Sequence, residues 1–104
     1  VSSGDEVYRA LIHVLMNDQN PGVRYQAVRS LVALADEEEV RGALRGALRD
    51  DVNQGVRLEA FQALVAYPEE ETLQVFRQKM DADSNEYIRA QSRQIVEASD
   101  GIVI

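Results

Sequence analysis

The sequence contains no cysteine and no tryptophan, and it has a single histidine, His13, and a single lysine, Lys79. Without cysteine there can be no disulfide, no thiolate metal site and no cysteine nucleophile. One histidine likewise excludes any metal or catalytic site that needs two imidazoles. No apolar run approaches the ~18–20 residues that a membrane-spanning helix requires. We therefore expect no cofactor, no catalytic activity and no membrane insertion by this segment.

Positive charge is also scarce, because 11 Lys and Arg residues face 18 Asp and Glu residues, for a formal net charge of -7. Binding of nucleic acid depends on clustered Lys and Arg, so this balance argues against it. The chain has 104 residues, of which 45% are hydrophobic and 28% are charged, a mixture typical of a globular protein. Its length predicts a single domain over residues 1–104.

An internal repeat is the strongest pattern in the sequence. A shift of 33 residues pairs Val7 with Val40, Leu11 with Leu44, Asp18 with Asp51, Asn20 with Asn53, Gly22 with Gly55, Arg24 with Arg57 and Leu31 with Leu64. A further shift of 32 pairs Leu44 with Phe76, Asp51 with Asp83, Asn53 with Asn85, Arg57 with Arg89 and Leu64 with Val96. The chain therefore divides into three repeats, at about 5–37, 38–69 and 70–99, with a tail at 100–104.

Each repeat contains two amphipathic helical patterns. Asn20, Asn53 and Asn85 each precede the second pattern, where an Asn side chain can cap free backbone amides. Pro21 follows at a position suited to the first turn of a helix. A hairpin of about 32 residues cannot bury its apolar face alone, so it stacks on its neighbours. The predicted fold is all-α: an α-α superhelix, or short solenoid, of six helices in three stacked antiparallel hairpins.

The apolar stripes predict one continuous core. It comprises Leu11, Leu15, Val23, Ala27, Leu31, Leu44, Leu48, Val56, Ala60, Leu64, Phe76, Met80, Ile88 and Val96. In the last repeat the charged residues Arg93 and Glu97 replace apolar residues on one flank, which indicates a polar cap. The opposite flank of the first repeat stays small or apolar at Ala10, Val14, Ser30 and Ala33. This uncapped flank and the first residue, Val1, lead us to expect a fragment of a longer protein.

The repeated motif carries a family resemblance. The pattern Asp-x-Asn-x-Gly-Val-Arg at 18–24 and 51–57, followed by Ala and Leu, resembles a HEAT repeat. Repeat three departs from it, with Glu86-Tyr87-Ile88-Arg89 in place of x-Gly-Val-Arg and Ser92 in place of Ala. This closing unit resembles the last repeat of the HEAT-like domains attached to bacterial membrane anti-sigma factors.

The resemblance implies a non-catalytic protein–protein interaction module whose partner is another protein or a peptide. Its narrower form implies the extracytoplasmic domain of a membrane-anchored bacterial anti-sigma factor, with an upstream transmembrane anchor and a periplasmic location. Without that narrower likeness the chain is expected to be cytoplasmic. The alternative is a structural oligomerisation or scaffold unit of a longer HEAT-repeat protein.

The repeated acid and base residues are interpreted as a structural Asp–Arg ladder, in which each Asp meets an Arg of its own or the next repeat. Its members are Asp18, Arg24, Asp51, Arg57, Asp83 and Arg89. The same Asp-x-Asn spacing opens calcium loops, but such a loop needs a glutamate at its twelfth position. That position holds Arg29, Gln62 and Gln94 here, which disfavours calcium.

The exposed face of the second helices is the predicted partner surface, because it mixes aromatic, amide and aliphatic residues with few carboxylates. Its members are Tyr25, Arg29, Val32, Leu58, Gln62 and Val65. Packing of Val32 and Val65 between repeats is the alternative, which leaves Tyr25 and Arg29 as the stronger candidates. The acidic runs at 5–6, 36–39 and 69–71 form a second candidate surface, for a basic partner. Their other explanation is stabilisation of the helix dipoles.

Two smaller features remain. His13 is expected on the surface, opposite the apolar stripe of the first helix. The apolar end Ile102-Val103-Ile104 could fold back, be disordered, add a strand to a partner's sheet or serve as a C-terminal peptide ligand.

Overall fold

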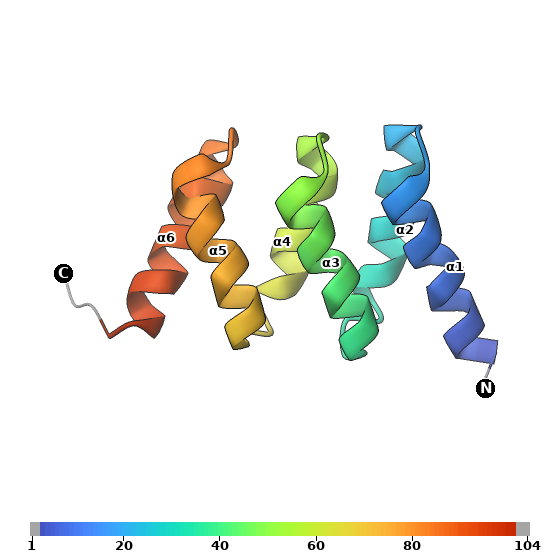
Figure 1. The fold of residues 1–104 in the computed structure, drawn as a ribbon, viewed down its shortest axis with the longest axis horizontal. Helices are drawn as coiled ribbons and strands as arrows, with labels where there is room; N and C mark the ends of the chain where they lie inside the picture. The colour runs from blue at the N-terminus through green and yellow to red at the C-terminus, as the bar shows by residue number, and fades with distance from the viewer. Residues whose placement is uncertain (1–2, 102–104) are drawn as a thin grey trace. The chain divides into compact units, whose positions relative to one another are not determined.

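The computed structural model describes residues 3–101, and within them the chain forms six α-helices and no strand, as the sequence predicts. The helices appear in chain order in Figure 1. They are α1 (Ser3–Asn17), α2 (Pro21–Val32), α3 (Glu38–Asp50), α4 (Gln54–Leu64), α5 (Glu70–Ala82) and α6 (Glu86–Ser99). The fold is therefore all-α. The apolar tail at 102–104 lies outside the described residues.

The chain separates into two compact units, residues 1–66 and 67–104. In the first unit, α1 pairs with α2 and α3 pairs with α4, which gives two antiparallel hairpins (Figure 1). These hairpins stack, because α2 packs on α4 and α1 packs on α3. The second unit is the single hairpin of α5 and α6. Stacking of this third hairpin on the others stays a prediction.

Each second helix begins at the predicted asparagine. Asn20, Asn53 and Asn85 have extended backbone dihedral angles, and each side chain accepts a backbone amide of the helix that follows. The accepted amides are those of Gly22, Val56 and Ile88, at 2.8, 3.1 and 3.0 Å. Such caps satisfy amides that have no partner inside the helix. The local sequence therefore fixes where α2, α4 and α6 start.

The first helices of the hairpins begin with acidic residues. The first turn contains Asp5 and Glu6 in α1, Glu38 and Glu39 in α3, and Glu70 and Glu71 in α5. At α3 and α5 the capping position itself is a glutamate whose side chain makes no capping bond. Negative charge at this end of a helix interacts favourably with the helix dipole.

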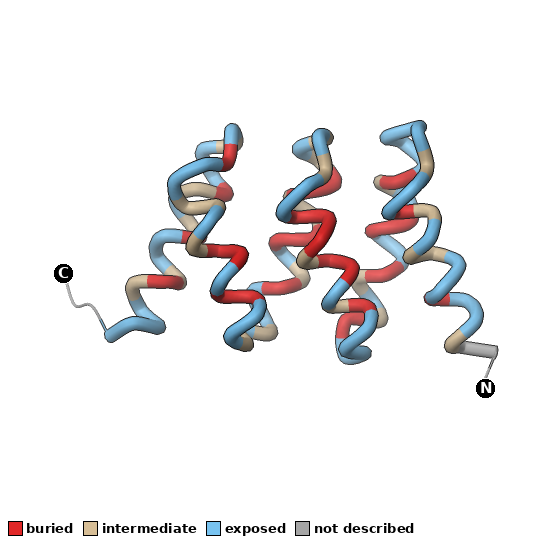
Figure 2. The backbone as a smooth tube through the Cα atoms, viewed as in Figure 1, coloured by how far each residue is buried: buried red, intermediate tan, exposed pale blue. Residues whose placement is uncertain are grey.

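Most of the predicted core is buried, and Figure 2 shows long buried stretches in α3 and α4. Leu31, Leu44, Leu64 and Ile88 are each fully inaccessible. The prediction is wrong for Val23, which is 41% exposed, although Val56 at the same place in the next repeat is 0% exposed. Helix α4 packs on α2 of the preceding hairpin, whereas no described hairpin precedes α2. Leu11 and Met80 are only half-buried. Continuity of one core through both units stays a prediction.

Candidate functional site

The repeated Asp–Arg motif closes the loop between the two helices of every hairpin. The Asp carboxylate accepts the backbone amide two residues later, at 2.8 Å for Asp18, 2.9 Å for Asp51 and 2.8 Å for Asp83. The Asp carbonyl oxygen accepts the guanidinium six residues later, in each of the pairs Asp18–Arg24, Asp51–Arg57 and Asp83–Arg89. Short polar side chains commonly order turns through such bonds to nearby backbone. The motif therefore holds each hairpin closed.

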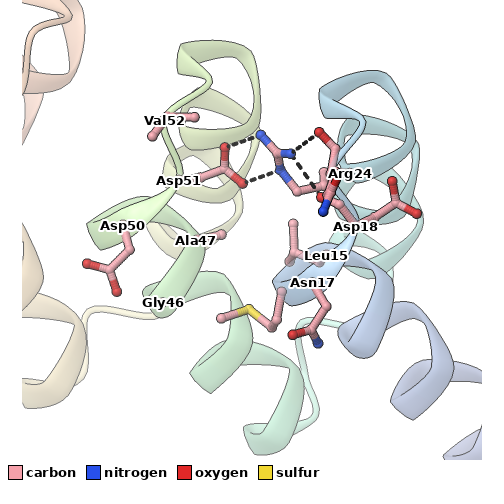
Figure 3. Close-up of a pocket in the computed structure, with 11 residues that line it drawn as sticks. Leu15, Asn17, Asp18, Arg24, Gly46, Ala47, Asp50, Asp51 and Val52 are labelled. Atoms are coloured by element: carbon pink, nitrogen blue, oxygen red, sulfur yellow. Dashed lines mark hydrogen bonds and ion pairs between the residues drawn. The ribbon is translucent and has the colours of Figure 1, made fainter.

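Arg24 also joins the first hairpin to the second. Its Nε and Nη2 donate to the two carboxylate oxygens of Asp51, at 2.9 and 3.0 Å (Figure 3). Both side chains are buried, with 11% and 7% of their areas exposed. The hydrogen bond to Asp51 raises the pKa of Arg24, against the lowering effect of burial. A two-pronged, buried pair of this kind fixes direction as well as distance. It sets the register in which the hairpins stack.

The direction of this pairing differs from the expectation. We expected each Asp to meet an Arg of its own or the next repeat, but the carboxylate of Asp51 pairs with Arg24 of the preceding repeat. The Arg of the same repeat, Arg57, donates to the carbonyl oxygen of Asp51 instead. The spacing in the sequence is the same for both neighbours, so it could not distinguish them.

A pocket of about 250 Å³ lies beside this ion pair, between the two hairpins of the first unit (Figure 3). It is lined by Leu15, Met16, Asn17, Asp18, Gln19, Arg24, Gly46, Ala47, Asp50, Asp51 and Val52. Arg24 could attract an anion here, but its hydrogen bonds go to Asp51, to the Asp18 carbonyl and to the Gln19 carbonyl. A guanidinium has five N–H donors, so little capacity is left for a ligand. We therefore interpret the pocket as a gap in the packing between the two hairpins.

In the second unit a cavity of about 390 Å³ opens beside charged residues of α5 and α6. Arg93 crosses between these helices and donates to the Asp81 carboxylate at 2.8 Å and to the Met80 carbonyl at 3.1 Å. Nearby, the ammonium of Lys79 lies 3.3 Å from the buried carboxylate of Asp83. Arg93 occupies the place that the buried residue Val28 has in α2. This flank of the third hairpin is therefore polar.

Tyr25, a predicted partner-binding residue, packs between the first and second hairpins. Its hydroxyl donates to Glu59 of α4 at 3.0 Å. Its ring lies so close to α4 that a Cβ added at Gly55 would be 3.7 Å from a ring carbon. Tyr25 therefore contributes to the packing of the second hairpin on the first, and its removal is expected to lower stability. Sequence reasoning missed Gly55 and Glu59 as its contacts. The alignment of Gly55 with Gly22 was the available signal, since a repeated glycine often marks close approach.

The other predicted partner-binding residues differ in exposure. Arg29 and Gln62 are exposed, and Val65 is 42% exposed, whereas Val32 and Leu58 are half-buried. The Arg29 guanidinium lies 5.9 Å from the centre of the Tyr25 ring, within the range of a cation–π contact. Arg29 and Gln62 hold equivalent places on α2 and α4, two helices that pack together. The outer face of α2 and α4 therefore offers one cation, one amide and one aliphatic residue.

The acidic runs, the second candidate surface, are partly engaged by arginines. Glu38 pairs with Arg41 at 2.8 Å and with Arg45 at 2.7 Å. Glu39 pairs with Arg9 at 3.4 Å, and Glu70 pairs with Arg77 at 3.1 Å. These pairs lower the net negative charge that a basic partner would meet.

His13 is exposed, as expected, and its carbonyl oxygen accepts a hydrogen bond from the side-chain amide of Asn17.

Within residues 3–101 no group of three or more His, Asp or Glu side chains is placed to hold a metal ion. Across the same residues no helix has the length and apolar character needed to cross a membrane.

Comparison with known proteins identifies the class. A family model of HEAT repeats matches residues 8–97, which is most of the 104-residue chain, so this protein belongs to the HEAT-repeat family. Repeats of this family generally mediate protein–protein interaction or scaffolding, and they are typically non-catalytic. No curated protein and no solved structure matches the chain significantly.

Proposed function

We propose that the chain is a non-catalytic module that binds another protein or peptide through the outer face of α2 and α4. The observation that supports this is the exposed pair Arg29 and Gln62 on two packed helices, with Val65 at the end of α4. Arginine and aromatic residues are enriched at the centres of interfaces, and Tyr25 lies beneath the Arg29 guanidinium. The chain as a whole is acidic, so this face is chemically distinct.

The test begins with a partner selected against the folded chain, for example from a displayed peptide library. The double variant Arg29→Ala/Gln62→Ala removes two exposed side chains, so its melting temperature should match that of the wild type. Its affinity for the selected partner should fall at least roughly tenfold, as for an interface centre. Isothermal titration calorimetry gives both affinities.

Arg49→Ala is the matched control, because Arg49 is half-exposed and pairs with its neighbour Asp50. Its affinity should equal that of the wild type. The proposal would be contradicted if the double variant bound as the wild type does. If replacing Glu37 and Glu39 by Gln then weakened binding, the acidic runs would be the binding site.

The narrower proposal, an extracytoplasmic domain of a membrane-anchored anti-sigma factor, depends on the closing unit Glu86-Tyr87-Ile88-Arg89 alone. The family match extends only to HEAT repeats in general.

A scaffold or oligomerisation unit within a longer HEAT-repeat protein is the second candidate function. The exposed apolar side chains Val7 and Val23, both on the first hairpin, favour it.

A further inference from the structure

One flank of the first hairpin carries apolar residues that are buried at the same positions of the second hairpin. Val7 is 56% exposed where Val40 is 0% exposed, and Val23 is 41% exposed where Val56 is 0% exposed. Ala10 of the same flank is exposed. Because the residue type is the same at these three positions and the exposure differs, this flank has the composition of a covered surface.

The contacts on the second hairpin show what kind of neighbour covers such a flank. Asp51 receives the bidentate Arg24, Gly55 lies against the Tyr25 ring, and Glu59 accepts the Tyr25 hydroxyl. The arginine and the tyrosine both come from α2, the second helix of the preceding hairpin.

The first hairpin repeats the receiving groups. Asp18, Gly22 and Gln26 stand where Asp51, Gly55 and Glu59 stand one repeat later. Among residues 3–101 the Asp18 carboxylate accepts only the Asn20 amide and forms no ion pair, and it lies on the far side of Arg24 from Asp51 (Figure 3). A small residue, an acceptor and a carboxylate are therefore placed for an incoming tyrosine and arginine.

We infer that the flank of α1 and α2 docks a further helical hairpin of HEAT type, which presents an arginine to Asp18 and an aromatic ring to Gly22. The hairpin stacks in the register in which α1 and α2 stack on α3 and α4. This deepens the scaffold candidate and does not depend on the outer face of α2 and α4.

A second copy of this chain is a poor occupant. To supply the hairpin in the register of α1 and α2 on α3 and α4, it would have to offer the flank of α6, where Arg93 stands at the place of the buried Val28 and is paired with Asp81. Stacking that flank on Val23 would bury a charged pair against apolar side chains, which is costly. The occupant is therefore a hairpin whose flank is apolar, like that of α2.

The experiment adds such a hairpin to the full chain. A second copy of residues 5–37 is fused directly before Asp5, so that the copy of Arg24 reaches Asp18 and the copy of Tyr25 reaches Gly22. The extended protein should unfold in one transition, with a higher melting temperature than the original chain.

Asp18→Asn then isolates the predicted ion pair, because the amide oxygen can still accept the Asn20 amide. The substitution should lower the melting temperature of the extended protein by about 5 °C more than that of the original chain, since a lost interaction shifts the midpoint of a small domain by several degrees. Val23→Glu is the second variant, and it should be harmful only in the extended protein.

Three outcomes would overturn the inference. The added hairpin could melt separately, with the original transition unshifted. Asp18→Asn could have the same effect in both proteins. Sedimentation of the original chain could also show a concentration-dependent dimer that Val23→Glu abolishes, which would assign the flank to a second copy.

Discussion

Among single residues, Arg24 contributes both to its own hairpin and to the next one. It donates to the Asp18 and Gln19 carbonyls within its hairpin and to both carboxylate oxygens of Asp51 in the second. Arg49 has the same charge but is 49% exposed and pairs with Asp50 beside it. The contrast separates a buried, networked pair from a surface pair.

Arg24→Ala should lower the free energy of unfolding by about 3 kcal/mol, because it leaves the buried Asp51 carboxylate without its partner. Arg49→Ala should cost about 0–1 kcal/mol, as is usual for exposed pairs. Urea denaturation monitored by circular dichroism measures both. Equal losses for the two variants would mean that the pair is not structural.

Ser92 occupies the place of Ala27 and Ala60, and its hydroxyl is buried without a hydrogen-bond partner among the described residues. An unsatisfied buried hydroxyl costs free energy, so Ser92→Ala should stabilise the protein by about 1 kcal/mol. The reverse change, Ala60→Ser, should destabilise it by a similar amount, since Ala60 is fully buried. Thermal melts of the two variants should shift in opposite directions. A lower melting temperature for Ser92→Ala would contradict the assignment.

Among the helices, the start of α3 shows how charge organises a helix end. Glu38 is the first residue of α3 and accepts from both Arg41 and Arg45, while Arg41 also donates to the Ala35 and Asp36 carbonyls of the preceding turn. The hydrogen bond from Arg45 is the main cause of the lowered pKa of Glu38. The link between the two hairpins is thereby tied to the helix that follows it.

This lowered pKa predicts the pH dependence of stability. A carboxylate whose pKa is lower in the folded state contributes stability above its unfolded pKa of about 4.3, and this contribution is lost as pH falls through the folded value. Glu38→Gln should therefore reduce the slope of melting temperature against pH below about pH 5. Arg45→Gln should reduce it less, because Arg41 still pairs with Glu38, and the double variant should resemble Glu38→Gln alone. If the change in slope in the double variant equalled the sum of the changes in the two single variants, the two residues would act independently.

Across the whole molecule, the sequence predicts the helices well and the contacts between hairpins poorly. The asparagine caps and apolar spacing are local, so the six helices and their pairing into hairpins could be predicted, and the structure confirms them. Burial of Val23 would require another hairpin packed on its flank, and the spacing of apolar residues does not predict whether such a hairpin is present. The partner of Asp51 could not be predicted, because identical repeats allow pairing in either direction. The packing of Tyr25 on Gly55 is also a contact between hairpins. The periodicity of α2 alone therefore predicted an exposed Tyr25 side chain.

The pairing of Lys79 with Asp83 has a practical consequence for chemical labelling. Lys79 is the only lysine in the sequence, and its side chain is 12% exposed, with the ammonium beside a carboxylate that is 0% exposed. Acylation of this amine should therefore be slow in the native protein and rise steeply in urea as the α5–α6 hairpin opens. Mass spectrometry of the peptide that contains Lys79 after a short reagent pulse measures this, and equal rates in buffer and in urea would contradict it. Unfolding of this hairpin can then be followed through the natural lysine. Lysine-directed crosslinkers will capture few neighbours, because the sequence has one lysine. Reagents that activate carboxylates will suit the chain better, because it has 18 Asp and Glu residues.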